Sequence, residues 1–306
     1  MRARVLQWVR EGRAIQLDQL RALEAIQEQL DQGNRLLNEL AYSNKESLDR
    51  QVRTDELFRI AHAGETLKHV REFQRERVLG PLETVEALRD ERMSFTRFGD
   101  GEFRLMFRPA ARLRFQDNSP QIAAELREAL ESTARGKGLL LGLPQVPESV
   151  HWASVWMNYW EEIEPIIRGI DCIGNSHVTR PPFFRQFGQD GVNAWRSVWD
   201  GLSATIVCGR GSRFELIDPL FDNLGAANFL YSRATNAYSD LRRVECEIAD
   251  MSGNDIALIS LGPAGTVLAH TLNRMGIWAI DIGHISSSFS NVFDGLPRPE
   301  ATPLDG

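Results

Sequence analysis

The chain has 306 residues, about two average domains in length, and 42% of its residues are hydrophobic and 25% are charged. This composition is ordinary for a globular protein, and it excludes a chain that is disordered throughout, a collagen-like fibre and a small disulfide scaffold. The net charge of −7 provides no overall positive field that would attract nucleic acid, so we expect no nucleic-acid partner.

Cysteine content and the distribution of apolar residues bear on the compartment. The basic N-terminus is interrupted by Arg10, Glu11 and Arg13, so it lacks the apolar core of a secretion signal. No run approaches the roughly 18 apolar residues of a membrane helix, and three cysteines without metal-ligand spacing are typical of a reducing compartment. We therefore expect a cytoplasmic protein without a transmembrane segment, and we leave open a peripheral contact with the inner membrane face.

Residues 1–79 differ in composition from the rest, because they contain no proline and are rich in Gln, Glu, Arg and Leu. Their apolar residues recur with alternating steps of three and four, which is a heptad-like pattern. We call these positions the seam: Leu6, Val9, Leu20, Leu23, Leu30, Leu37, Ala41 and Leu48, with polar Gln27, Asn34 and Asn44 among them. The pattern predicts a helical, coiled-coil segment that joins copies of the chain into a homo-oligomer. The alternative is a long amphipathic helix lying on the chain's own globular part.

A second helix is expected over residues 54–78, and Gly80-Pro81 ends the helical region. Strand-like and helix-like segments then alternate over residues 80–295, which predicts an α/β domain with a Rossmann-like, mostly parallel sheet and helices on both faces. Residues 296–306 contain three prolines and are expected to form a loose tail. The predicted strands cover residues 94–98, 139–144, 169–173, 203–209, 228–232, 256–262 and 277–283.

Two turns after predicted strands have the composition of a phosphate-binding loop. The turn Gly262-Pro263-Ala264-Gly265 leads into a helix near Thr266, whose first N–H groups have no partner within the helix. The segment 208–214, CGRGSRF, places two arginines beside two glycines. Neither turn matches a dinucleotide fingerprint or a P-loop, so an ordinary helix start and a solvated loop remain as alternatives.

An acidic motif follows the predicted strand at residues 94–98. Asp100 and Glu102 are separated by Gly101, whose conformational freedom lets both carboxylates turn toward one point. Such a pair suits Mn²⁺ or Mg²⁺, which would bridge a nucleotide diphosphate. Gly99 and Gly101 would bring the backbone close to the ligand, and Arg97 would contact phosphate or orient a carboxylate. The alternative is a polar hairpin turn.

The segments RFGDGEF (97–103) and LGPAGTVLAHTLNRMGIWAIDIGHI (261–285) together resemble the GT-D-fold glycosyltransferases, which have an Asp-x-Glu motif near the start of the domain and a related closing segment. Intermediate segments fit the family in order, namely LLLGLP (139–144), HVTRPPFF (177–184), DPLFDN (218–223) and ATNAYS (234–239). The resemblance covers about residues 82–285 and leaves out the helical N-terminal region.

The resemblance implies metal-dependent transfer of a sugar, glucose or a related hexose, from a UDP-sugar to a glycan or glycoconjugate acceptor. It makes Asp100 and Glu102 the catalytic and metal-binding pair, with His284 as a further metal or phosphate contact. The other residues that it places at the nucleotide-sugar site are Arg180, Asn236, Gly262, Pro263, Gly265, Thr266 and Asp281.

Two departures from the family pattern leave other functions open. Ala264 stands where the family often has Thr, and the segment after His284 reads ISSSFSNVF instead of the usual acidic and aromatic continuation. A non-catalytic module that binds a nucleotide sugar or serves assembly is therefore an alternative. A nuclease or phosphatase is a third hypothesis, although two-metal sites normally recruit more carboxylates than this sequence offers.

Overall fold

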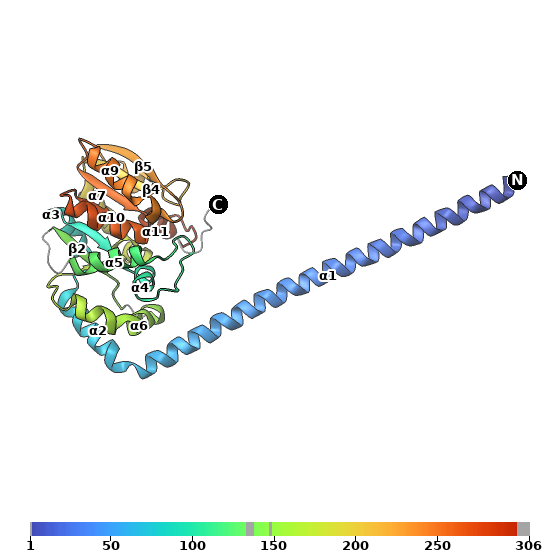
Figure 1. The fold of residues 1–306 in the computed structure, drawn as a ribbon, viewed down its shortest axis with the longest axis horizontal. Coiled ribbons are helices and arrows are strands. Elements are labelled where there is room, and N and C mark those ends of the chain that lie inside the picture. Colours follow the sequence, from blue (N-terminus) through green and yellow to red (C-terminus); the bar gives the residue numbers. More distant parts are fainter. Residues whose placement is uncertain (1, 133–137, 147–148, 299–306) are drawn as a thin grey trace. The chain divides into compact units, whose positions relative to one another are not determined.

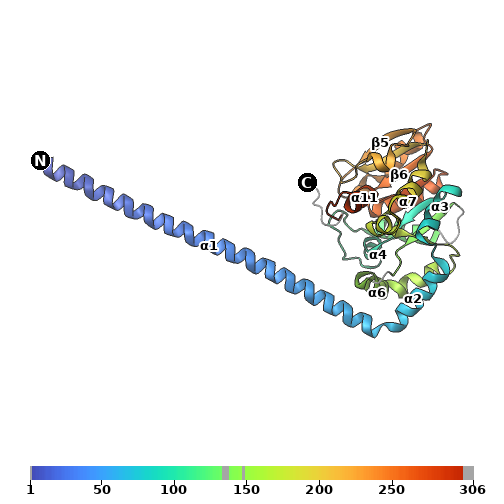
Figure 2. The same ribbon diagram turned by 180° about the vertical axis from the view of Figure 1, so that it is seen from behind.

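The computed structural model describes residues 2–132, 138–146 and 149–298, and the chain divides into two units, Met1–His62 and Ala63–Gly306 (Figures 1 and 2). The first unit is a single helix, α1 (Arg2–His62), of 61 residues. The seam side chains Leu30, Leu37 and Leu48 are 57%, 65% and 61% exposed in the single chain. The earlier seam positions, Leu6 to Leu23, lie outside the described side chains. The N-terminal helix is confirmed, and the coiled coil stays a prediction. The second helix, expected from residue 54, begins only at Gly64, because α1 continues to His62.

The second unit begins earlier than the boundary expected at residue 80. Helix α2 (Gly64–Arg77) packs through Leu67 and Val70 against α6 (Val150–Ile167). The buried Gln74 joins α2 to the loop that contains residues 144–146. Its Nε2 donates to the Pro144 carbonyl at 3.0 Å, and its Oε1 accepts from the Val146 N–H at 2.9 Å. Buried apolar contacts and a satisfied buried amide therefore make α2 part of the globular unit.

A seven-stranded sheet forms the centre of the globular unit, with the order β3-β2-β1-β7-β6-β4-β5 and parallel pairing between all neighbours. The predicted parallel α/β sheet is thus confirmed. The strands are β1 (Ser94–Arg97), β2 (Leu139–Leu143), β3 (Gly174–Asn175), β4 (Ser203–Gly209), β5 (Ala226–Ser232), β6 (Ile256–Ser260) and β7 (Ala279–Asp281). The strand expected at residues 169–173 is wrong, because the short β3 follows that segment.

Helices cover both faces of this sheet, as parallel sheets require. One face packs against α2, α4 (Asp100–Phe107), α5 (Pro120–Ser132), α6, α9 (Leu241–Asp250) and α10 (Pro263–Arg274). The other face packs against α3 (Pro81–Asp90), α7 (Pro181–Trp199), α8 (Asp218–Phe221) and α11 (Ile285–Phe293). Two short 3₁₀ helices, η1 (Ser176–Thr179) and η2 (Ala237–Asp240), follow β3 and β5. Among the described residues, no helix combines the length and apolar character needed to cross a bilayer.

The strand order positions the functional region. From β1 the chain moves outward through β2 to β3, and then crosses to β4 on the other side of β1. The order therefore reverses beside β1, and in open α/β sheets ligands bind outside the carboxyl ends of the strands at such a switch point. The loops that leave β1, β6 and β7 meet there.

Candidate active site

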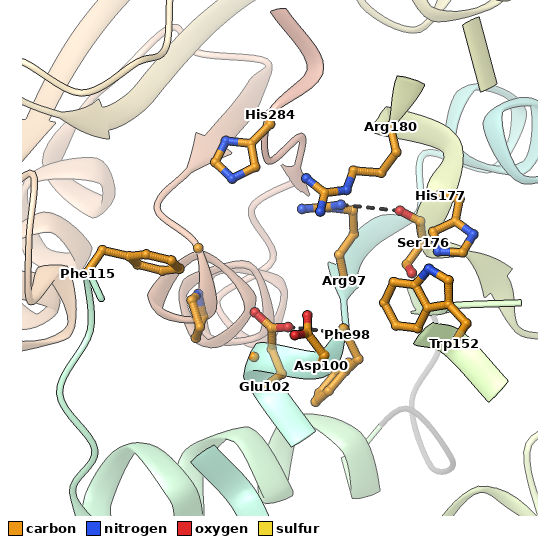
Figure 3. A pocket seen from close by; sticks show the side chains of 14 residues that line it. Arg97, Phe98, Asp100, Glu102, Phe115, Trp152, Ser176, His177, Arg180 and His284 are labelled. Carbon is orange, nitrogen blue, oxygen red and sulfur yellow. Dashed lines mark hydrogen bonds between the residues drawn. The ribbon is translucent and has the colours of Figure 1, made fainter. Parts of the chain in front are cut away.

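Two adjoining cavities lie at the carboxyl edge of the sheet. They share four lining residues, Arg97, Phe115, Gly262 and His284. The first cavity is lined in addition by Phe98, Gly99, Asp100, Gly101, Glu102, Trp152, Ser176, His177, Arg180 and Pro263 (Figure 3). The second is lined in addition by Gly209, Ser212, Arg213, Phe214, Arg233, Ala234, Ala237, Ser260, Leu261 and Gly283. The acidic motif and the glycine turn, 160 residues apart in sequence (102 to 262), thus border one cavity.

The acidic motif forms the first turn of α4 and not the polar hairpin turn that was the alternative. Gly99 is the N-cap residue, and its N–H donates to Glu102 Oε2 at 2.8 Å. Asp100 is the first helical residue, so both carboxylates lie at the positive end of the helix, where negative charge is stabilised. Gly101 is helical too; a Cβ there would lie 3.3 Å from Leu113 Cδ1, so its lack of a side chain permits close packing.

The glycine turn joins β6 to α10. Gly262 has φ +58° and ψ −141°, a backbone conformation that is almost exclusive to glycine, and Pro263 begins the helix. A Cβ on Gly262 would lie 2.8 Å from Phe115 Cε2, so the aromatic ring rests directly against this turn. The backbone at the start of α10 is therefore open to the first cavity and flanked by an aromatic wall.

Three predicted site residues lie behind the cavity wall and do not line it. Gly265, Thr266 and Asp281 are buried; Thr266 Oγ1 donates to the Arg97 carbonyl at 2.8 Å and lies 3.3 Å from Asp281 Oδ2. Asp281 Oδ1 also accepts from the Gly283 N–H at 2.9 Å and lies 3.6 Å from Arg97 Nε. Direct contacts with the ligand were expected for these residues. Instead, the Thr266 and Asp281 side chains form a network with Arg97 that holds the ends of β1 and β7 together.

Asn236, another predicted contact residue, is also outside both cavities. It adopts a left-handed backbone conformation, and its side chain accepts from the Asp117 N–H at 2.7 Å and donates to Asp117 Oδ2 at 2.9 Å. Its own N–H donates to the Phe115 carbonyl at 2.8 Å. Asn236 therefore anchors the loop that presents Phe115, which explains its position without a direct ligand contact.

Arginines and a neutral histidine form the wall above the acids (Figure 3). Arg97 Nη1 donates to the Ser176 carbonyl at 3.2 Å, and a Cβ on Gly283 would overlap the Arg97 guanidinium. Burial holds the pKa of His284 well below its ordinary value, and the charges of Arg180, Arg97 and Arg213 lower it further. His284 is therefore a neutral hydrogen-bonding group among cations, a setting that suits an anionic ligand.

The structure tests the metal set expected from the sequence. Within residues 2–132, 138–146 and 149–298, no three His, Cys, Asp or Glu side chains are grouped so that they could hold a metal ion. His284 therefore does not complete a three-ligand site with Asp100 and Glu102. The two carboxylates still fit Mg²⁺ or Mn²⁺, because such ions are commonly bound by one or two carboxylates together with substrate phosphates.

Burial perturbs one carboxylate of the pair. It raises the pKa of Glu102 from 4.5 to about 7, although a backbone hydrogen bond and the charge of Arg97 oppose the shift; the charges of Asp281 and Asp100 add to it. Glu102 is half-buried by solvent accessibility, so part of this effect is screened by water. A carboxylate that exchanges its proton near neutral pH is suited to acid–base chemistry.

This shift predicts a pH-dependent change in stability. Between pH 4.5 and about 7 the folded chain keeps a proton on Glu102 that the unfolded chain has lost, so stability falls as the pH rises through this range. Glu102→Gln cannot ionise, so it removes this loss of stability at higher pH. Its amide oxygen can still accept from the Gly99 N–H. We expect its Tm in EDTA to exceed that of the wild type at about pH 8 and to match it at about pH 4. A Tm difference that is constant with pH in differential scanning fluorimetry would contradict this expectation.

Several residues that line the cavities were not among the site residues predicted from the sequence. Phe115 lies in the loop between α4 and α5, and Trp152 is one of several aromatic residues in α6. Ser176, His177 and Arg233 follow strands β3 and β5 and could have been found from the rule that sites gather at carboxyl ends. Of the two arginines in the 208–214 turn, Arg213 lines the second cavity. Arg210 instead lies 4.8 Å from the Tyr231 ring centroid.

The two departures from the family pattern have structural explanations. Ala264 is fully buried in the core and lines neither cavity, so the hydroxyl it lacks is not missing from the cavity wall. In the serine-rich segment, Ser286 Oγ donates to the Glu215 carbonyl at 2.6 Å and Ser287 Oγ lies 3.5 Å from the Arg213 carbonyl. These serines hold the loop that forms one side of the second cavity.

A parallel sheet that presents acids, arginines and a glycine-led helix at its switch point defines an α/β protein built to bind an anionic ligand such as a nucleotide. Comparison with known proteins makes this specific, because the model of the family "Glycosyltransferase GT-D fold" matches residues 95–294. The chain belongs to this family and has the GT-D fold.

Similar proteins agree with this assignment. Glycosyltransferase GlyD of Streptococcus pneumoniae serotype 4 is 26% identical over 223 residues, and the probable glycosyl transferase Gly of Streptococcus gordonii is 28% identical over 227 residues. Each match covers 69% of this chain, but only 27% and 32% of the respective relative. The chain thus spans less than a third of the length of these relatives.

Solved structures show the same fold. The domain of unknown function 1792, described as having a distinct glycosyltransferase fold, superposes with a TM-score of 0.67 at 24% identity, over 75% of this chain and 86% of that one. A glycosyltransferase of the same domain class from Streptococcus sanguinis gives a TM-score of 0.63 at 26% identity, over 72% and 85% of the two chains.

Proposed function

We propose that this glycosyltransferase moves a hexose from a UDP-sugar to a glycan or glycoconjugate acceptor with the help of Mn²⁺ or Mg²⁺. The observation that supports this most strongly is the meeting of Asp100, Glu102, Gly262 and Pro263 on one cavity. Carboxylates bind divalent cations, and the free N–H groups at the start of a helix bind phosphate. Together these groups can bind a diphosphate whose charge is neutralised by a metal ion.

The arrangement assigns a role to each group. Asp100 and Glu102 would hold the cation, which when bound neutralises charge that develops on the departing diphosphate. Arg97 and Arg180 would orient the phosphates, and neutral His284 would add a hydrogen bond. The acceptor hydroxyl oxygen forms a bond to the anomeric carbon while the bond from that carbon to the diphosphate oxygen breaks. A Glu102 oxygen that is not bound to the cation would take the hydroxyl proton.

The second cavity suits the nucleoside of the donor. Its walls include the apolar side chains Phe115, Phe214 and Leu261, and the basic side chains Arg213 and Arg233. An aromatic wall offers a stacking surface for a nucleobase, and nearby arginines favour the adjoining phosphates. In this arrangement the nucleoside occupies the second cavity, the diphosphate lies at the shared wall beside the acids, and the sugars occupy the first cavity.

We also propose that α1 joins copies of the chain. A 61-residue helix gains little stability alone when the leucines among its described side chains are exposed, since long isolated helices depend on burial of an apolar face. The seam provides such a face for a second α1, so we expect a homo-oligomer.

The function is tested by a donor screen. We expect release of UDP from at least one of UDP-glucose, UDP-galactose and UDP-N-acetylglucosamine with Mn²⁺, and loss of release in EDTA, measured by mass spectrometry. Binding of UDP and Mn²⁺ should also raise Tm, by an amount that corresponds to about 2.7 kcal/mol at a ligand concentration near 100 times Kd. Binding without turnover of any donor would favour the non-catalytic module. Release that is unaffected by EDTA would contradict the metal requirement.

A further inference from the structure

Trp152, near the start of α6, forms the side of the first cavity that faces away from Phe115 (Figure 3). Its ring is held on two sides, because the His151 ring centroid lies 5.0 Å away at an interplanar angle of 71° and that of His177 lies 4.9 Å away at 58°. A Cβ placed on Gly99 would lie 3.8 Å from Trp152 Cη2, so the indole also contacts the backbone that caps the acid-bearing helix. Trp152 is thus a fixed aromatic surface beside Asp100.

The surroundings of this ring suit an uncharged ligand. Burial, followed by the charges of Arg180, Arg97 and His151, lowers the pKa of His177 to about 3, so the imidazole that contacts Trp152 is neutral. The face of an indole is electron-rich, and the C–H groups on one face of a pyranose ring are weakly positive, so the two attract when stacked. Polar groups of Ser176 line the same cavity and can meet sugar hydroxyls.

We infer that Trp152 is the platform on which the acceptor's terminal pyranose, a neutral sugar ring, stacks; this inference rests on the proposed transferase function. The donor diphosphate must reach the glycine turn, and that turn lies on the Phe115 side of the acids. Trp152 lies on the other side of the acids (Figure 3). An acceptor sugar on Trp152 would therefore bring its hydroxyl to the anomeric carbon from the side that the diphosphate leaves free.

Stacking of the acceptor predicts a selective kinetic effect. In assays with UDP-glucose, Trp152→Ala should raise the acceptor KM by about tenfold, whereas the donor KM should change by less than about twofold. Trp152→Phe keeps an aromatic face and should recover most of the loss. Tyr231→Ala is the matched control, because Tyr231 is an exposed aromatic residue that lines neither cavity. Its donor and acceptor KM should equal those of the wild type.

Direct binding provides a readout that does not require turnover. The probes are methyl β-glucoside and methyl N-acetyl-β-glucosaminide, observed by saturation-transfer NMR with the full chain in the presence of UDP and Mn²⁺. We expect a signal for at least one glycoside with the wild type, Trp152→Phe and Tyr231→Ala, and its loss with Trp152→Ala at a temperature where circular dichroism shows this variant to be folded.

Different failures have different meanings. A rise in donor KM with Trp152→Ala, together with unchanged glycoside binding, would assign Trp152 to the donor sugar and overturn the inference. Release of UDP from a donor by wild-type protein that binds neither glycoside would overturn it while the transferase function stands. Failure of every UDP-sugar in the donor screen would overturn the proposed function, and the inference with it.

Discussion

Asp100→Asn and Glu102→Gln are each expected to reduce sugar transfer by at least about 100-fold, the scale found when one electrostatic group is removed from a preorganised site. Each variant removes one of the two carboxylates that line the first cavity. Both replacements are nearly isosteric, and the amide oxygen that Glu102→Gln introduces can still accept from the Gly99 N–H, so the first turn of α4 should stay formed. Transfer is measured as UDP release and product formation under saturating Mn²⁺.

The control for these variants is a carboxylate away from the cavity. Glu128 is 52% exposed and pairs with Arg274 at 2.6 Å, on the helices that cover one face of the sheet. Glu128→Gln should transfer sugar at the wild-type rate, because an exposed ion pair contributes little even to stability. Full turnover by both Asp100→Asn and Glu102→Gln would show that the acidic motif is not the reaction centre.

Leu37→Lys is expected to convert the oligomer to a smaller species, with the largest effect on mass of any single change in α1. A lysine at a seam position places a charge in the apolar contact between helices and removes a leucine from it. Leu36→Lys is the matched control, because Leu36 is next in sequence but off the seam. The two leucines are similarly exposed in the single chain, at 53% for Leu36 and 65% for Leu37.

The measurement is light scattering coupled to size-exclusion chromatography, with circular dichroism at the same concentrations. We expect Leu37→Lys to lower both the molar mass and the helical signal and Leu36→Lys to change neither, because a long polar helix without a partner frays. A wild-type chain that elutes as a monomer, or equal effects from both variants, would contradict a coiled coil with this seam.

The order of apolar and helical segments along the chain was sufficient to predict the architecture of the globular unit. Segments of apolar residues bounded by glycine and proline alternate with helical patterns, and this alternation leaves a parallel sheet as the compact solution. The N-terminal region was also predicted to be helical, because it contains no proline and its apolar residues recur at helical spacing. The acids after β1 and the glycine turn after β6 were recognisable because both follow apolar strands directly, and local chain chemistry suffices to identify such positions.

Which of these residues reach the cavities depends on how the helices and strands pack together. Gly265 and Thr266 on α10 and Asp281 at the end of β7 share a motif with Gly262, but all three are buried behind the cavity wall, where the Thr266 and Asp281 side chains support Arg97. Trp152 enters the cavity because α6 packs beside the start of α4, a contact between segments about 50 residues apart. Side-chain direction and long-range packing depend on the three-dimensional arrangement of whole elements, and a linear pattern does not contain that information.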